Sequence, residues 1–205
     1  NDAAVISGTS TASLTETDTV LAASGGLSAT DVDSATTFVA QTDVPGSGGY
    51  GKFSIAGNGA WTYTANSAHN EFVGGQTYTD SLTVATADGS SQVLTVSILG
   101  SNDAAVITGS SSASLTETDA VLTAAGSLSA TDVDSAATFV AQTDVAGSGG
   151  HGSFSIASNG AWTYTASSAH NEFKAGQTYT DSLTVATADG TTQVITVSIA
   201  GTNDA

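Results

Sequence analysis

The chain has 205 residues, 40% of them hydrophobic, and its 19 Asp and Glu residues against two Lys and Arg residues give a formal net charge of −17 at pH 7. This negative charge excludes a nucleic-acid-binding protein and a protein that adheres to anionic membrane surfaces, because both partners would repel it. The absence of cysteine excludes disulfides, thiol catalysis and thiolate metal sites, whereas the unbalanced carboxylates favour a bound cation.

The sequence repeats itself with a period of 101 residues, so that the Asn-Asp pair at the start recurs at residues 102–103 and 203–204. Within one period 81 of 101 positions are identical, without insertion or deletion. Self-similarity over a domain-length period indicates a tandem array. We therefore expect one domain over residues 1–101, a second over residues 102–202, and the start of a further linker at residues 203–205. A chain that begins within such a motif looks like a piece of a longer protein.

Each copy is predicted to be all-β, because Thr, Val, Ser and Ala predominate and turn residues recur about every ten positions. Residues 66–73 lack the alternation of a strand and are predicted to form a single helical turn. Seven or eight strands with this spacing are typical of a Greek-key β-sandwich. In the first copy the strands are expected at residues 3–7, 11–16, 25–30, 36–42, 52–56, 60–65, 77–86 and 91–99.

The glycine-rich stretch "GSGGYG" at residues 46–51 formally matches the G-x-G-x-x-G pattern of dinucleotide-binding proteins. That pattern requires a strand before it and a helix after it, because the helix N-terminus binds the pyrophosphate. Here a strand is predicted to follow. The stretch is therefore interpreted as a flexible turn.

Residues 52–65 are predicted to form a β-hairpin around the sequence Gly-Asn-Gly. Trp61 and Tyr63 lie two residues apart in its second strand, so their side chains share one face. This spacing favours aromatic rings in the core of a sandwich. The alternative is an exposed platform that stacks against sugars.

His69 and His170 occupy equivalent positions, and each is followed by Asn and Glu. A catalytic histidine needs a nucleophile and an orienting third group, and no motif for such a site accompanies either residue. Both are therefore interpreted as solvated loop residues, and no enzyme is expected. Four acids are interpreted as isolated polar residues at strand ends or surfaces, without a role: Asp43, Asp80, Asp144 and Asp181.

The remaining acids gather in short motifs, which include Glu16 in "LTETD", Asp31 and Asp33 in "SATDVDS", Asp88 in "ATADG" and the Asn-Asp linker. A D-x-D spacing places two carboxylates about 7 Å apart on one side of an extended segment. Such oxygen pairs suit a hard cation that takes about six to eight oxygen ligands. The spacing is not that of an EF-hand loop.

Over its whole length each copy resembles a VCBS-type repeat, which is cadherin-like and occurs in long bacterial surface proteins of the RTX adhesin kind. The stretches "SLTETD", "LSATDVDS", "GAWTYT", "YTDSLTVATADG" and "TVSILGSNDAAV" carry the resemblance. It implies two tandem cadherin-like β-sandwiches of the immunoglobulin type, arranged as an extended rod. It also implies an extracellular location on a bacterial cell surface. The RTX nonapeptide itself is absent.

In cadherins the corresponding elements converge on Ca²⁺ ions between consecutive domains, so the resemblance implies Ca²⁺ at the interdomain junction. Glu71 takes the place of the mid-domain acidic ligand, although "HNEF" departs from the Leu-Asp-Arg-Glu pattern. The residues that match the cadherin ligands are Glu16, Glu71, Asn102, Asp103, Asp132, Asp134 and Asp189.

These observations predict structural extender repeats of a large bacterial adhesin, which Ca²⁺ stiffens and which project a distal ligand-binding domain away from the cell. The expected partners are neighbouring repeats of the same chain, in a monomeric rod. No apolar run approaches the roughly eighteen residues of a membrane-spanning helix, so no membrane insertion is expected. The alternative is a binding module that itself contacts glycans or partner cells, which an exposed Trp61 would favour.

Overall fold

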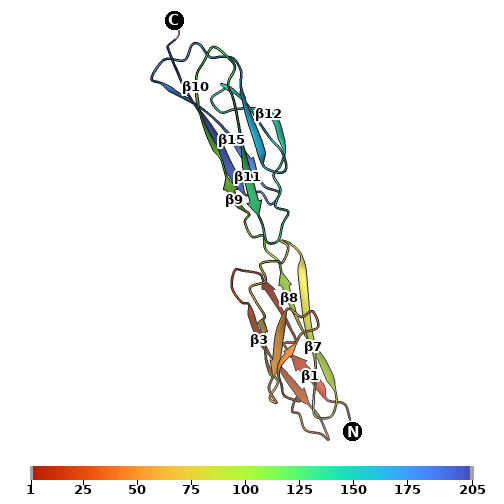
Figure 1. The fold of residues 1–205 in the computed structure, drawn as a ribbon. Helices are drawn as coiled ribbons and strands as arrows, with labels where there is room; N and C mark the ends of the chain where they lie inside the picture. The colour runs from red at the N-terminus through yellow and green to blue at the C-terminus, as the bar shows by residue number, and fades with distance from the viewer. Residues whose placement is uncertain (1, 204–205) are drawn as a thin grey trace. The chain divides into compact units, whose positions relative to one another are not determined.

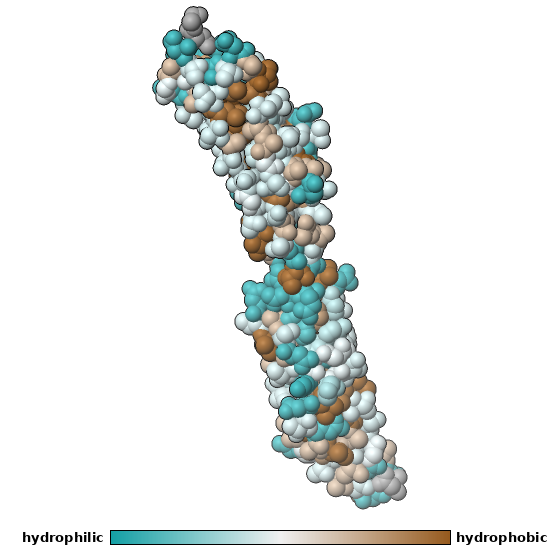
Figure 2. Space-filling model, viewed as in Figure 1, coloured by the Kyte–Doolittle hydropathy of each residue, from teal (hydrophilic) through white to brown (hydrophobic). Residues whose placement is uncertain are grey.

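The computed structural model describes residues 2–203. The chain divides into two compact domains, Asn1–Asp103 and Ala104–Ala205. Over the described residues each domain contains eight β-strands and no helix (Figure 1). No helix long and apolar enough to cross a bilayer is therefore found between residues 2 and 203. Figure 2 shows a visible face of mostly intermediate hydropathy, on which hydrophobic residues form small separate patches.

The first domain is a sandwich of two sheets, with strand orders β1-β3-β6-β5-β4 and β2-β8-β7. Its strands are β1 (Val5–Gly8), β2 (Thr11–Thr15), β3 (Ala22–Thr30), β4 (Gln41–Pro45), β5 (Gly51–Ile55), β6 (Ala60–Ala65), β7 (Thr77–Ala85) and β8 (Ser91–Leu99). This architecture confirms the all-β sandwich predicted from the strand spacing.

The second domain repeats this arrangement, with sheets of order β12-β13-β14-β11-β9 and β10-β16-β15. Its strands are β9 (Val106–Gly109), β10 (Ser112–Thr116), β11 (Thr123–Thr131), β12 (Gln142–Ala146), β13 (Gly152–Ile156), β14 (Ala161–Ala166), β15 (Thr178–Ala186) and β16 (Thr192–Ala200). The tandem arrangement of two sandwiches is therefore confirmed as well.

The core of the first domain lies between its two sheets and is formed by side chains at alternate strand positions. In β6 the burial alternates along the strand, and Trp61 and Tyr63 are 1% and 0% exposed. The indole Nε1 of Trp61 donates to the carbonyl oxygen of Thr9 at 2.7 Å. The prediction that these aromatic rings lie in the core is thus confirmed. Their burial also leaves neither ring exposed to stack against a sugar.

The predicted strand at residues 36–42 is wrong, because β4 begins only at Gln41. Phe38 makes a single bridge, to Thr86. Asp43 has a left-handed φ of 51°, and the pairing of β4 with β5 shifts register between Gln41 and Val44. A bulge at a non-glycine residue with positive φ is not visible in the alternation of residue types.

The predicted helical turn at residues 66–73 is also wrong. His69 has a φ of 64°, which a right-handed helix does not allow. The segment instead forms a single tight turn, in which the N–H of Phe72 donates to the carbonyl oxygen of His69 at 2.9 Å.

The sequence context of Asp80 suggested a residue at a strand end or surface, but its side chain is completely buried. Its carboxylate accepts hydrogen bonds from the N–H groups of Gly48 at 2.7 Å and Gly51 at 2.9 Å and from the Tyr63 hydroxyl at 3.3 Å. Burial, together with the Asp80 charge, raises the pKa of Tyr63. The glycine-rich loop therefore binds an anion through its backbone, and that anion belongs to the protein itself.

Asp181 is the buried counterpart of Asp80 in the second domain, and the interpretation of both as surface residues is therefore wrong. It accepts hydrogen bonds from Gly149 N at 2.6 Å, His151 N at 3.1 Å and the Tyr164 hydroxyl at 3.2 Å. A buried carboxylate needs such donors, because desolvation would otherwise strongly disfavour its charge.

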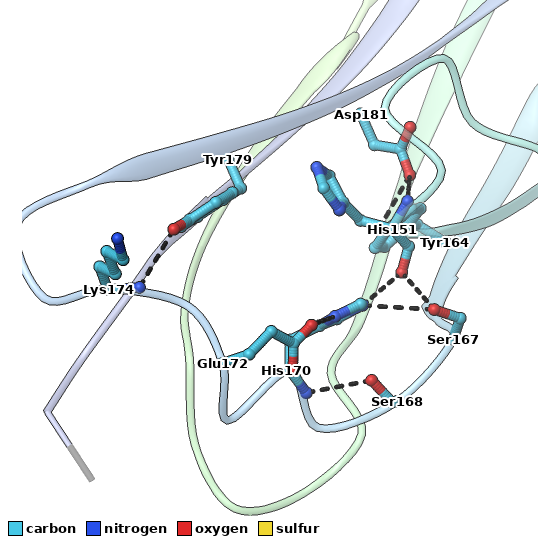
Figure 3. A network of polar contacts seen from close by, with 9 residues as sticks. All are labelled: His151, Tyr164, Ser167, Ser168, His170, Glu172, Lys174, Tyr179 and Asp181. Carbon is cyan, nitrogen blue, oxygen red and sulfur yellow. Dashed lines mark hydrogen bonds and ion pairs between the residues drawn. The ribbon is translucent and has the colours of Figure 1, made fainter.

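The two equivalent histidines are buried as well, at 7% exposure for His69 and 6% for His170, so their interpretation as solvated residues is wrong. In the second domain His170 Nδ1 lies 2.8 Å from Glu172 Oε1, and its Nε2 lies 2.7 Å from the carbonyl oxygen of His151 (Figure 3). Both partners are hydrogen-bond acceptors, an arrangement that suits a ring in which both nitrogens carry a proton. Burial by itself lowers the pKa of His170, but these two hydrogen bonds, together with the charges of Glu172 and Asp181, outweigh it and raise the pKa above the ordinary value.

Candidate metal centre

Glu16 lies directly after β2, where its backbone continues the pairing with β8 by donating to the carbonyl oxygen of Leu99 at 2.8 Å. Its side chain is 2% exposed. One carboxylate oxygen, Oε2, accepts a hydrogen bond from the Ser101 hydroxyl at 2.6 Å. The other, Oε1, is buried without a hydrogen-bond partner. A buried carboxylate oxygen in this state is costly unless a cation compensates it.

Two further carboxylates lie beside Glu16. Oxygen atoms of Glu16, Asp18 and Asp103 all lie within 4.8 Å of one another, the one such group of acids or histidines found over residues 2–203. The side-chain amide of Asn70 donates to Asp18 Oδ1 at 3.4 Å. Two oxygens bound to one Ca²⁺ lie at most about 5 Å apart, twice the usual Ca–O distance. The three carboxylates therefore fit a single ion, and without one they repel each other.

Asp18 is the member of this group that the sequence analysis missed. It follows Glu16 by two residues in "LTETD", the same spacing that singled out the D-x-D pairs. That spacing was the available signal, because residues two apart on an extended segment point to the same side. Asp103 comes from the opposite end of the domain sequence, and only the fold brings it to Glu16.

The second domain repeats the Glu16 arrangement at Glu117, which is 1% exposed. Glu117 Oε2 accepts hydrogen bonds from the backbone N–H of Thr202 at 3.1 Å and from the Thr202 hydroxyl. Its Oε1, like that of Glu16, is buried without a hydrogen-bond partner. The counterpart of Asp103 is Asp204, which lies outside the described residues.

The two acids of the second D-x-D motif form a turn within the second domain. Asp132 Oδ1 accepts hydrogen bonds from the N–H groups of Asp134 at 3.1 Å and Ser135 at 2.8 Å. Asp132 Oδ2 is buried without a hydrogen-bond partner, and Asp134 is 9% exposed. The motif thus holds a further buried carboxylate oxygen that a cation would satisfy.

Asp189 accepts a hydrogen bond from the backbone at the beginning of the second domain. Its two oxygens accept four hydrogen bonds, from the Thr187 hydroxyl, the Thr191 hydroxyl at 2.6 Å, the Thr191 N–H at 3.2 Å and the Ala105 N–H at 3.0 Å. The hydroxyls of Thr187 and Thr191, followed by the N–H of Ala105, hold the pKa of Asp189 well below its usual range. A carboxylate has about four lone-pair positions, so in this state Asp189 anchors the backbone of Ala105.

The structure does not bring Glu71 to the carboxylate group. Its side chain is 59% exposed, and its Oε1 lies 2.8 Å from His69 Nδ1. This hydrogen bond lowers the pKa of Glu71. Asn102, in the linker, donates from its side-chain amide to the backbone carbonyl oxygen of Asp103 at 3.0 Å.

The family model for the bacterial cadherin-like domain matches the sequence twice, at residues 1–100 and 102–201. A comparison with curated protein sequences found no match. Several solved structures resemble the chain in fold. PcdhgB3 EC1-4 is 14% identical with a TM-score of 0.50 and covers 99% of this chain and 50% of its own.

Two further structures are similar at lower TM-scores. The protocadherin gammaB7 EC3-6 cis-dimer is 16% identical with a TM-score of 0.49, covering 98% of this chain and 48% of its own. Mouse cadherin-23 EC22-24 is 16% identical with a TM-score of 0.45, covering 98% and 67%. The chain thus spans about half the length of the protocadherin chains, and at these identities the likeness concerns the fold alone.

Proposed function

Because the chain belongs to the bacterial cadherin-like domain family, we propose that its two domains are structural extender repeats of a large bacterial cell-surface adhesin. In this role they lie outside the cell and hold a distal ligand-binding domain away from it. Their partners are neighbouring repeats of the same chain. The near-identity of the two copies supports this role, because a spacer needs length and stiffness rather than individual binding surfaces.

We further propose that Ca²⁺ stiffens the connection between consecutive repeats. The observation that carries this part is the buried, unpartnered Oε1 of Glu16 beside the carboxylates of Asp18 and Asp103. A ligand set of oxygens without nitrogen or sulfur suits a hard cation such as Ca²⁺. When bound, the ion supplies the positive charge that allows the three carboxylates to lie together.

The other proposed Ca²⁺ ligands lie outside the cluster of Glu16, Asp18 and Asp103, and they are proposed from the sequence motifs. Asn102 belongs to the linker, and Asp132 and Asp134 would contribute from the second domain, where Asp132 has an unpartnered buried oxygen. Asp189 contributes by fixing the backbone of Ala105, two residues after Asp103. Glu71 has no part in the proposed site, because it is paired with His69.

The rival function, a module that itself binds glycans, loses its main support in this fold. Trp61 and Tyr63, the two rings considered for a sugar platform, are almost fully buried. We therefore propose a structural role rather than a binding or enzymatic one.

The calcium proposal is tested by thermal unfolding of the 205-residue chain with Ca²⁺ or with a chelator. Binding to the folded state alone stabilises by about 2.7 kcal/mol at a free ion concentration of about 100 times Kd, so Ca²⁺ should raise the Tm. Glu16→Gln and Asp18→Asn should reduce this rise, whereas Asp144→Asn, an exposed matched control, should not. An equal rise in all four proteins would contradict the assignment of the ligands.

Small-angle scattering tests the stiffening separately. With Ca²⁺ bound, the maximum dimension of the chain should be larger and more uniform than in chelator. If the maximum dimension stays the same while the Tm still rises, the ion binds but does not stiffen the junction, and the extender mechanism is wrong.

A further inference from the structure

In each domain the first and last strands of the same sheet are paired in parallel, whereas every other strand pairing within residues 2–203 is antiparallel. In the first domain β2 pairs with β8, from Thr11 opposite Thr95 to Thr15 opposite Leu99. Strand β2 lies near the start of the domain sequence, and β8 ends it. The two strands through which the chain enters and leaves this sheet are therefore bonded directly to each other.

Backbone hydrogen bonds extend the pair beyond the strand ends on both sides. The N–H of Thr95 donates to the carbonyl oxygen of Ser10, and the N–H of Glu16 donates to that of Leu99, each at 2.8 Å. The second domain has the same two bonds, from Thr196 to Ser111 at 2.9 Å and from Glu117 to Ala200 at 2.8 Å. The parallel pair is thus one continuous ladder in both domains.

The parallel direction decides how tension would load this ladder. In a parallel pair the N-terminal end of β2 and the C-terminal end of β8 lie at opposite ends. Tension applied through the chain ends therefore pulls the strands past each other and loads all the bonds together. Strands pulled apart from one end would instead lose their bonds one after another. A single hydrogen bond contributes only about 1 kcal/mol net, so simultaneous loading is what gives resistance.

The chain on either side of this ladder is also attached to its own domain. Before β1, the N–H of Ala4 donates to Asp88 Oδ2 and to Ser90 Oγ, each at 2.9 Å. After β8, the N–H of Gly100 donates to the carbonyl oxygen of Gln76 at 2.8 Å, and Ser101 is bonded to Glu16. Tension would therefore reach the ladder through bonded segments rather than through loose ends.

We propose that each domain is a load-bearing unit, in which the β2–β8 ladder, and β10–β16 in the second domain, resists unfolding when the chain is pulled by its ends. This goes beyond the spacer role, because it is a property of each domain by itself and requires no calcium. The physical class of the function is resistance to tension along the polypeptide.

The direction of pulling gives the sharpest test, and the absence of cysteine makes selective attachment simple. In one protein, handles are attached to the two ends of the 205-residue chain. In the other, Thr11→Cys and Val93→Cys, at exposed positions, place both handles near one end of the β2–β8 pair. We expect end-to-end pulling to require at least about twice the unfolding force, because unfolding under force follows the barrier that is loaded.

Both proteins are first shown to have the same Tm, so that a difference in force reflects direction alone. The measurements are made in Ca²⁺ and in chelator. A lower or equal force for end-to-end pulling in chelator would overturn the proposal, whatever the outcome of the calcium titration. A higher end-to-end force in chelator supports it even if no Ca²⁺ binds.

A proline pair tests the ladder itself, with the second domain as reference in the same molecule. Because Ser10 O and Glu16 N face β8 and backbone groups alternate along a strand, the N–H of Ala12 faces β8 and that of Ser13 faces away. Ala12→Pro should lower one of the two unfolding forces, whereas Ser13→Pro should lower neither. Equal effects of the two substitutions would contradict a role of the ladder.

Discussion

Ser101 donates a hydrogen bond to Glu16 Oε2 at 2.6 Å, although 85 residues separate the two in the sequence. The bond joins the last residue of the first repeat to the most deeply buried carboxylate of the candidate metal centre. In the second domain Thr202 makes the same bond to Glu117. A hydroxyl at this position therefore donates to the buried glutamate in both copies, even though Ser and Thr differ.

The two copies supply a matched pair of substitutions for this bond. Ser101→Ala would leave Glu16 Oε2 buried without its hydroxyl donor, which should cost about 1–3 kcal/mol of unfolding free energy. Ser101→Thr introduces the residue of the second copy and should change stability little. Denaturant unfolding in chelator measures both, and a loss as large for Thr as for Ala would show that the hydroxyl does not matter.

The buried carboxylate of Asp80 should be needed for the stability of the first domain. Asp80→Asn keeps the shape but removes the charge that accepts hydrogen bonds from Gly48, Gly51 and Tyr63. Bonds to charged groups contribute about 1.5–3 kcal/mol, so a loss of at least that size is expected. Asp43→Asn, at an exposed position, is the control. Similar midpoints for the two variants in denaturant unfolding would contradict the role given to Asp80.

The glycine-rich loop should tolerate almost no side chain at Gly46. A Cβ at Gly46 would lie 2.0 Å from Asp80 Oδ1, whereas one at Gly26 would meet nothing within 4 Å. Gly46→Ala should therefore destabilise the first domain by roughly 3 kcal/mol or more, because the buried carboxylate must move. Gly26→Ser, which copies Ser127 of the second domain, should be nearly neutral. Thermal unfolding compares the two, and a neutral Gly46→Ala would disprove the close packing of the loop.

The stability of the second domain should fall as the pH rises above neutrality. Because the pKa of His170 is raised above its ordinary 6.5, the folded domain holds this proton more tightly than the unfolded chain does. The stabilisation is fully present below about pH 6.5 and is lost as the pH rises through the higher folded value. The hydrogen bond from His170 lowers the pKa of Glu172 from its ordinary 4.5. The contribution of Glu172 to folding stability is therefore present above about pH 4.5 and is lost on acidification.

Denaturant unfolding from pH 5 to about pH 9 measures this effect in a His151→Tyr background, which carries the first-domain residue and removes the neighbouring histidine. His170→Gln should abolish the alkaline loss of second-domain stability. If the slope persists in that variant, another group causes it. The ¹⁵N chemical shifts of the His170 ring report directly whether both nitrogens are protonated at neutral pH.

Sequence patterns of short range determined much of the fold. The 101-residue period defined two equivalent copies, and period-two alternation in the segment from Lys52 to Ala65 predicted the hairpin and the inward direction of Trp61 and Tyr63. Such features depend on residues that are neighbours in the chain, so residue type and spacing suffice to predict them. The acidic motifs likewise indicated Glu16 and Asp103 as candidate ligands.

Only the tertiary structure decided which side chains became buried partners. Asp80 and His69 look like ordinary polar residues in the sequence, and their burial depends on a glycine-rich loop and on the carbonyl group of Tyr50, which lie 19 or more residues away. The place of Asp18 beside Asp103 depends on the ends of the domain meeting. The sequence determined how each strand alternates, because alternation is local. The fold decided where the charges lie, because their desolvation and their donors come from distant segments.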